Sequence, residues 1–136
     1  MKEVYRKDLV YPELNYKIVG CAIKVFKNLG PGLLEKRYQQ GLAIELKNAG
    51  LKFEEQVKVP QYYGEKLLGN GFIDFVVEDK VILELKRGQF YFSGEVQQIQ
   101  NYLKSKKLQL GIILRFTDYG VRFKRIVDLP GYDQVA

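Results

Sequence analysis

Two apolar runs on either side of one helical segment constrain the fold of this chain most. Residues 80–86 read KVILELK and residues 108–116 read LQLGIILRF, while residues 93–107 between them repeat apolar side chains at helical spacing. Apolar runs of this kind are typical of central strands that are covered on both faces. A strand, helix and strand in succession predict a crossover helix in a mixed sheet, and therefore an α/β fold.

The remaining periodicities give the element order ααβββαββ. Helical spacing predicts a first helix over 13–29, a turn at the GPG of 30–32, and a second helix that Gly50 ends. Period-two patterns predict strands over 51–63, 71–77 and 121–129, with a turn at Gly64 and Glu65. Ser93 is a candidate N-cap for the third helix. The stripe of the second helix is Leu34, Tyr38, Leu42 and Leu46.

Length and composition limit the chemistry that the chain can carry. Its 136 residues predict one domain, 1–136, with residues 1–12 as an N-terminal arm. The absence of histidine excludes imidazole catalysis and histidine-based zinc sites, and the single cysteine, Cys21, fits a core position in a reducing cytoplasm. We expect no membrane segment, because no stretch approaches about 18 consecutive apolar residues. A net charge of +6 favours an acidic partner such as nucleic acid.

The predicted hairpin over 72–86 carries charges that a buried strand does not need. Alternation places Phe72, Asp74 and Val76 on one face of its first strand, and Ile73, Phe75 and Val77 on the other. Ile82, Glu84 and Lys86 share a face of its second strand. If the connection centres on Asp79, Asp74 lies opposite Glu84, with Cβ atoms about 5 Å apart.

Two buried acids that face each other suit a divalent cation. Ionised carboxylates in an apolar sheet are costly unless they are paired or bind a metal. Oxygen ligands from Asp74, Glu84, a backbone carbonyl such as that of Leu85, and water suit Mg²⁺ or Mn²⁺. Lys86 projects about 6 to 7 Å further along the same face, where it could assist an activated water. The alternative is an edge hairpin that exposes Asp74, Glu84 and Lys86 as a solvated row.

These residues also resemble a known family. Asp74 followed by Glu84-Leu85-Lys86 resembles the PD-(D/E)XK nuclease signature, with Ile73 in place of its proline. Residues 29–51 are similar to the opening of the GxxExxY proteins of that superfamily. The named positions of that opening are Gly32, Glu35 and Tyr38, and Gln98 and Tyr102 match a Q-x-x-x-Y element of related nucleases.

The resemblance implies a restriction-endonuclease-like core with a central mixed β-sheet flanked by helices. It implies that Asp74 and Glu84 are the main metal ligands, that Glu35 completes or supports the metal site, and that Lys86 is the catalytic lysine. It further implies that Gln98 and Tyr102 position Lys86 or the scissile phosphate. Structural roles are open for several of these residues: Tyr38 could be core, Glu35 a first-turn acid, and Gln98 and Tyr102 a polar helix face.

Basic and aromatic residues outside this set are candidates for nucleic-acid contact. Arg87 and Tyr91 belong to RGQFYFSGE, residues 87–95, where Phe90, Tyr91 and Phe92 could stack on unpaired bases, wedge a duplex, or pack against the core. Several other basic side chains could contact phosphates or be plain surface charge. They are Lys104, Lys106, Lys107, Arg115, Arg122, Lys124 and Arg125.

Three functions fit these observations. The first is a Mg²⁺-dependent deoxyribonuclease, in which an activated water attacks the phosphodiester and Lys86 stabilises the developing charge. The second is a nucleic-acid-binding or regulatory module with the same fold that does not cut. The third is an interaction protein with an exposed charged hairpin. A homodimer is an option for the nuclease, because domains of this size often cut two strands as dimers.

Overall fold

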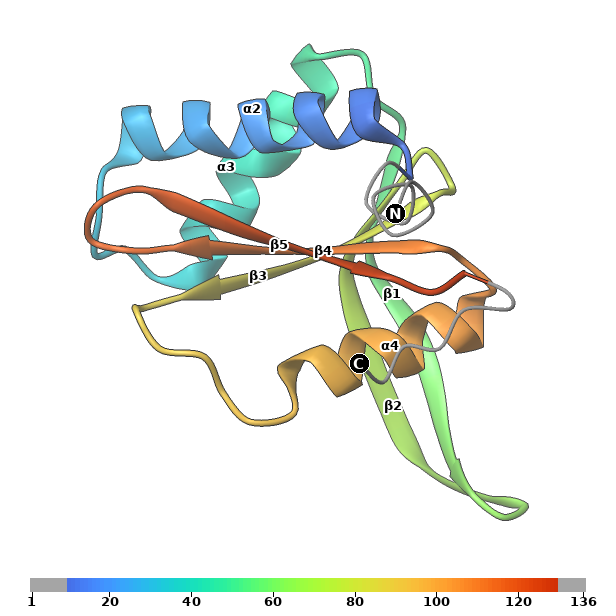
Figure 1. The fold of residues 1–136 in the computed structure, drawn as a ribbon. Coiled ribbons are helices and arrows are strands. Elements are labelled where there is room, and N and C mark those ends of the chain that lie inside the picture. The colour runs from blue at the N-terminus through green and yellow to red at the C-terminus, as the bar shows by residue number, and fades with distance from the viewer. Residues whose placement is uncertain (1–9, 130–136) are drawn as a thin grey trace, which may run out of the picture.

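The computed structural model describes residues 10–129, and its elements follow the predicted order ααβββαββ. The helices are α2 (Pro12–Leu29), α3 (Glu35–Asn48) and α4 (Glu95–Lys106). The strands are β1 (Phe53–Tyr63), β2 (Lys66–Val77), β3 (Val81–Arg87), β4 (Leu110–Phe116) and β5 (Val121–Val127). Figure 1 shows α2 and α3 on one side of the sheet and α4 on the other.

Within residues 10–129, one mixed sheet of five strands lies at the centre, in the order β1-β2-β3-β4-β5. β3 and β4 are parallel, with α4 as their crossover, and the other neighbouring pairs are antiparallel. Leu83 and Leu85 of β3 pack toward α2 and α3, whereas Ile82 packs toward α4. The prediction of a central strand covered on both faces is therefore confirmed.

The helix ends differ in detail from the expectations. α3 begins at Glu35, and Leu34 just before it is 66% exposed, so Leu34 does not belong to the buried stripe of Tyr38, Leu42 and Leu46. α4 follows Gly94 in a left-handed conformation (φ 91°), without a side-chain cap, so Ser93 is not its N-cap. Cys21 is buried in the core, as predicted.

The connection from β2 to β3 has the predicted register. Glu78 and Asp79 both have φ near 54°, and the amide of Lys80 donates to the carbonyl of Val77 over 3.0 Å. Val77 pairs with Val81, and Phe75 with Leu83. The turn therefore centres on Asp79, and the register continued by one residue would set Asp74 opposite Glu84, although regular pairing ends at Phe75 and Leu83.

A local distortion in the β1–β2 hairpin changes which side chains share a face. Gln56 of β1 has a positive φ of 50°, and the regular pairs of β1 with β2 omit Gln56 and Asp74. Beyond this point Ile73 packs in the same cluster as Val76, on the α4 side, while Phe75 faces the other side. The predicted alternation is therefore wrong at Asp74, because the strand changes its orientation there.

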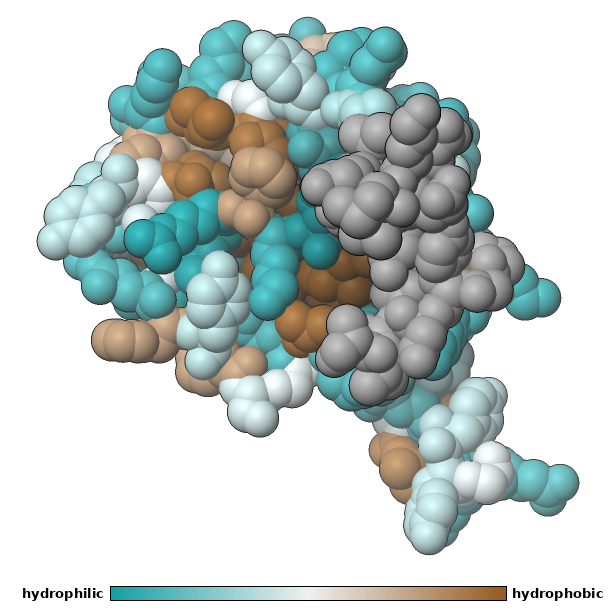
Figure 2. All heavy atoms as spheres, viewed as in Figure 1, coloured by the Kyte–Doolittle hydropathy of each residue, from teal (hydrophilic) through white to brown (hydrophobic). Residues whose placement is uncertain are grey.

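The rest of this hairpin leaves the body of the molecule. β2 starts at Lys66, five residues earlier than the predicted 71, and the paired strands extend past α4 (Figure 1). In Figure 2 the end of the hairpin stands clear at the lower right and carries residues of mixed hydropathy. Among the helices described within residues 10–129, none is both long and apolar enough to cross a membrane. Most of the predicted N-terminal arm, residues 1–9, lies outside the described residues.

Candidate metal and phosphodiester site

Asp74 lies where β2 and β3 stop pairing. The last regular pair before Asp74 is Phe75 with Leu83. Beyond it the Oδ2 atom of Asp74 accepts a hydrogen bond from the backbone amide of Leu85 over 2.8 Å. A carboxylate thus takes the place of a strand carbonyl, and it is held at the point where the two strands part.

The same bond fixes the direction of the Leu85 carbonyl. In a strand the N–H and C=O of one residue point toward the same neighbour. The Leu85 carbonyl therefore points toward the side where Asp74 lies, beyond the last regular β2–β3 pair. A carbonyl oxygen beside two carboxylates is a suitable ligand for a hard divalent cation.

Glu84 is the most unusual titratable group near this gap. Its side chain is 5% exposed, and its Oε1 atom is buried without a hydrogen-bond partner. Burial, the charge of Asp74 and a hydrogen bond with the Asp74 carboxyl raise the pKa of Glu84 to about 9. A buried Glu84 on an internal strand rules out the solvated edge hairpin, and with it the main feature of the third predicted function.

Lys86 and Glu35 approach this carboxyl pair from different elements. Lys86 lies two positions beyond Glu84 on β3, is half-buried, and its positive charge opposes the rise in the pKa of Glu84. Glu35 is the first residue of α3. Burial raises the pKa of Glu35, as does the charge of Asp74, while Lys86 lowers it. Glu35 therefore lies within electrostatic range of both groups.

The loop before α3 is held in place by Tyr38. The Tyr38 hydroxyl donates to the carbonyl of Gly30 over 2.8 Å and accepts from the amide of Leu33 over 3.2 Å. Its ring is 1% exposed and stacks on Phe116. Tyr38 is thus a core residue that fixes the start of α3, which explains the spacing of Tyr38 from Glu35 without a catalytic role.

Arg87 joins β3 to the same loop, because its guanidinium donates to the Leu33 carbonyl over 2.7 Å. The sequence suggested Arg87 for nucleic-acid contact and gave no signal for this bond. Arg87 therefore connects the strand that carries Glu84 and Lys86 to the loop that leads to Glu35.

The described residues do not supply a complete set of metal ligands from side chains alone. Within 10–129, no three acidic or cysteine side chains come together in a way that could hold a metal ion. Within this range Glu35, Asp74 and Glu84 therefore do not form one three-acid ligand group in the observed arrangement. The residues fit a cation best through the Asp74 and Glu84 carboxylates and the Leu85 carbonyl, since the buried Oε1 atom of Glu84 has no partner.

Tyr102 and Gln98 have different surroundings although both lie on α4. Tyr102 is 4% exposed, and burial together with the charges of Glu84 and Asp74 raises its pKa. A Cβ at Gly71 of β2 would come within 2.6 Å of the Tyr102 hydroxyl, so this position has no room for a side chain. Gln98 lies one helical turn before Tyr102 on α4, and its side chain is exposed.

Gln56 is a neighbour of the site that the sequence did not indicate. Its amide donates to the Oδ1 atom of Asp74 over 3.3 Å, from the distorted position in β1. A positive φ at a glutamine has no signal in the local sequence, so this contact depends on the tertiary structure.

The prediction that Arg115 contacts phosphates is wrong, because this residue is buried and already paired. It is 1% exposed, and its guanidinium donates to Glu95 over 2.6 Å and to the Phe90 carbonyl over 2.9 Å. It also lies 4.2 Å from the ring centroid of Tyr91. Arg115 therefore anchors the β3–α4 connection from within, and neither this role nor its partner Glu95 was predicted.

The other basic residues that were suggested for nucleic-acid contact lie in several separate regions. Lys86 pairs with Arg115 and Arg115 with Arg122, so these three residues form a row across β3, β4 and β5. Lys124 is exposed and lies 5.4 Å from the Tyr91 ring. Arg125 donates to the carbonyl of Val10. Lys104, Lys106 and Lys107 lie at the far end of α4 from Glu95.

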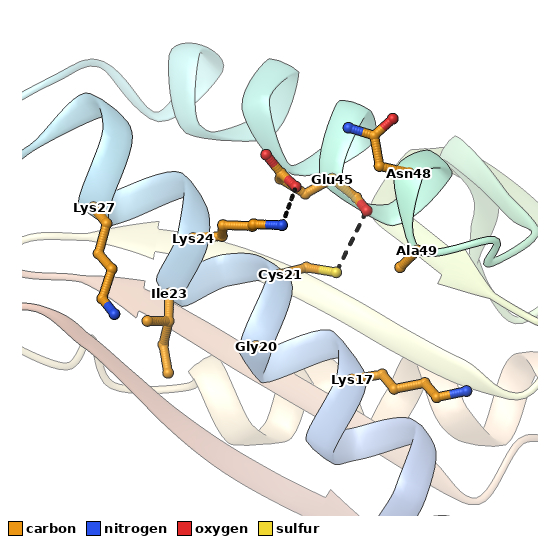
Figure 3. Close-up of a pocket in the computed structure, with 9 residues that line it drawn as sticks. All are labelled: Lys17, Gly20, Cys21, Ile23, Lys24, Lys27, Glu45, Asn48 and Ala49. Carbon is orange, nitrogen blue, oxygen red and sulfur yellow. Dashed lines mark hydrogen bonds and ion pairs between the residues drawn. The ribbon is translucent and has the colours of Figure 1, made fainter.

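A separate hollow lies between α2 and α3 and lacks the chemistry described above. It measures about 380 Å³, and Figure 3 shows Lys24 beside Glu45 and the thiol of Cys21 directed at the Glu45 backbone carbonyl. Its lysines belong to an exposed helix face. The carboxyl pair on β2 and β3 is therefore the better candidate site.

Comparison with known proteins shows the family of this chain. The sequence pattern of the PD-(D/E)XK nuclease superfamily matches residues 12–126, so the chain belongs to that superfamily. Nucleases of this superfamily generally use divalent metal ions. The mixed sheet with helices on both sides is a restriction-endonuclease-like α/β fold, as predicted.

One solved structure supports the fold. The crystal structure of the protein SSO0001 matches with a TM-score of 0.54 and 21% sequence identity. The match covers 74% of this chain and 52% of that chain, so this chain spans about half the length of SSO0001. Among curated proteins, none is matched by this sequence.

Proposed function

We propose that this protein hydrolyses phosphodiester bonds of DNA with Mg²⁺ or Mn²⁺ held by Asp74, Glu84 and the Leu85 carbonyl. The observation that carries the proposal is the buried Oε1 atom of Glu84, which has no partner and lies beside Asp74. A buried carboxylate oxygen without a partner destabilises the fold unless a cation binds to it. We also propose that the chain belongs to the GxxExxY group within its superfamily.

The side chains around this pair have separate roles in the proposed reaction. When bound, a divalent ion supplies Lewis-acid activation of water and neutralises charge at the phosphate. Lys86 stabilises negative charge that develops on the phosphoryl oxygens, because it lies on the same strand face as Glu84. Glu35 completes or supports the metal site from the start of α3, within electrostatic range of Asp74 and Lys86. Tyr102 and Gln98 position Lys86 or the phosphate.

Three substitutions test this function. Asp74→Ala, Glu84→Ala and Lys86→Ala should each reduce the cleavage of a DNA substrate in Mg²⁺ by at least about a hundredfold, with thermal unfolding still cooperative. Tyr16→Ala is the matched control, because Tyr16 is 80% exposed on α2, in the helical layer across the sheet from α4. Full activity in all three purified variants would contradict the proposal.

A non-cleaving module with the same fold is the second candidate. The observation that favours it is that no third acidic side chain joins Asp74 and Glu84 within the described residues. It predicts DNA binding without cleavage in Mg²⁺ or Mn²⁺. Homodimer formation and a cytoplasmic location stay predictions, of which the first can be measured by analytical ultracentrifugation.

A further inference from the structure

A small hollow lies beyond the end of β4, between the β3–α4 connection and the β4–β5 turn. It has a volume of about 150 Å³. Its lining residues come from both segments and from the start of β5, and they are Gln89, Phe90, Thr117, Tyr119 and Arg122. Two aromatic residues and one arginine therefore line the same space.

The backbone on one side of this hollow is firmly held. The buried guanidinium of Arg115 donates to the carbonyl of Phe90, and the amide of Gly88 donates to the carbonyl of Phe116 over 3.0 Å. The side-chain amide of Gln89 donates to Asp118 over 3.1 Å, which joins the connection to the turn. The position of Phe90 is therefore set by contacts with β4 and with the turn.

The other side of the hollow is held by Thr117. Its hydroxyl donates to the carbonyl of Gly120 over 2.8 Å and accepts from the amide of Tyr119 over 3.1 Å. The Thr117 side chain is buried at the end of β4. The turn that presents Tyr119 is consequently as well fixed as the connection that presents Phe90.

The aromatic side chains themselves are left in solvent. Phe90 is 81% exposed and Tyr119 is 87% exposed, and Phe92 nearby is 67% exposed. Packing against the core, one of the alternatives for this aromatic stretch, is therefore wrong for Phe90 and Phe92. In Figure 2 hydrophobic residues stand at the lower left, where Figure 1 places the β3–α4 connection. Large exposed rings on a fixed backbone are suited to stacking on a flat ligand.

Charge connects this hollow with the candidate site. Arg122 lines the hollow and lies in the same cross-strand row as Lys86, with Arg115 between them. Two strand spacings separate Lys86 from Arg122, which is about 10 Å. Because Arg115 is already paired with Glu95, the other two cations of this row are Lys86, which is half-buried, and Arg122, which is exposed. A chain of phosphates can contact both.

We propose that the hollow binds one unpaired nucleobase next to the scissile phosphate, with Phe90 and Tyr119 stacking on the base and Arg122 contacting its phosphate. The inference rests on the proposed nuclease function for its place beside the metal site. It adds that the substrate contains a single-stranded segment. Paired bases in a blunt duplex are already stacked, so they cannot enter between the two rings without being unstacked.

Binding in a chelator tests this inference apart from catalysis. The probe is a fluorescently labelled oligothymidine, measured by anisotropy in EDTA, with an unlabelled blunt duplex as competitor. Phe90→Ala and Tyr119→Ala should each weaken binding by about tenfold. Arg122→Gln should reduce the slope of log Kd against the logarithm of salt concentration by about 0.7. Tyr16→Ala, at an exposed tyrosine of α2, should leave affinity unchanged, and the duplex should compete poorly.

The outcomes separate this inference from the proposed function. Unchanged oligothymidine affinity in both aromatic variants would overturn the inference, even if cleavage is intact. If Phe90→Ala and Tyr119→Ala weaken binding of the blunt duplex as much as binding of oligothymidine, the inference is also overturned, because the hollow would then not need an unpaired base. Weakened oligothymidine binding in a protein that never cleaves would support the hollow and count against the nuclease function.

Discussion

At the scale of a single residue, the carboxyl group of Glu84 is the feature from which the chemistry follows. It is 5% exposed, lies beside Asp74 and has a pKa raised to about 9 by burial first and by Asp74 second. Without a cation Glu84 holds a proton at neutral pH, since burial and the adjacent charge of Asp74 disfavour its ionised form. A bound cation must displace that proton, so its affinity should increase with pH.

The proton on Glu84 also makes stability depend on pH. Between pH 4.5, the ordinary pKa, and about 9 the folded protein holds a proton that the unfolded chain has released. The free energy of unfolding should therefore fall as pH rises through this window, by at most about 1.4 kcal/mol per pH unit. Urea unfolding in EDTA at several pH values measures this slope.

The matched control for that experiment is Glu84→Gln, which keeps the shape and cannot ionise. It should remove the part of the slope that Glu84 contributes. Identical slopes in the two proteins would mean that Glu84 is already ionised in the folded state, and a proton held on Glu84 would then be ruled out.

Sequence patterns identified Asp74 and Glu84 because charge in an otherwise apolar run is a local signal. The contact of Gln56 with Asp74 has no such signal, since it depends on a positive φ in another strand. Arg115 was misjudged for a related reason, because a basic residue looks the same in sequence whether it is solvated or paired with Glu95.

At the scale of elements, the buried pair of Arg115 and Glu95 ties the start of α4 and the β3–α4 connection to β4. Arg115 also holds the Phe90 carbonyl and lies against the Tyr91 ring. A pair of this kind adds little net stability but is costly to break, because the remaining charge is left buried. Its role is to fix where the connection lies relative to Lys86.

Removing one partner of this pair should therefore lower the free energy of unfolding more than removing both partners does. Glu95→Ala should lower the free energy of unfolding by about 3 to 5 kcal/mol, and Arg115→Met with Glu95→Leu should recover most of that loss. Chemical denaturation of the two variants and the wild type measures both effects. A cost below about 1 kcal/mol for Glu95→Ala would show that the pair is solvated.

Element order and type followed from periodicity, whereas element ends depended on backbone geometry. The β2–β3 register was predictable because a tight turn at Asp79 fixes it. The long β1–β2 hairpin and the change of faces at Asp74 were not, because the distortion involves two strands at once. Ser93 was chosen as a cap by residue type, but Gly94 in a left-handed conformation precedes α4 instead.

At the scale of the whole molecule, the site lies where the sheet opens. β2 parts from β3 after one tight segment of pairing, and the two helical layers cover the sheet on either side of this gap (Figure 1). Asp74 comes from β2, Glu84 and Lys86 from β3, Glu35 from α3 and Tyr102 from α4. Every layer therefore contributes a residue near the gap, in a chain that belongs to the PD-(D/E)XK nuclease superfamily.

Mn²⁺ binding at this gap is the most direct test of the proposed metal site. Crystals of the wild-type protein soaked in MnCl₂ should show an anomalous peak between the carboxylates of Asp74 and Glu84 and near the Leu85 carbonyl. The peak should be absent from crystals of Glu84→Gln treated in the same way. A wild-type crystal above neutral pH with no peak there, and with Glu84 still hydrogen-bonded to Asp74, would contradict a metal site at this carboxyl pair.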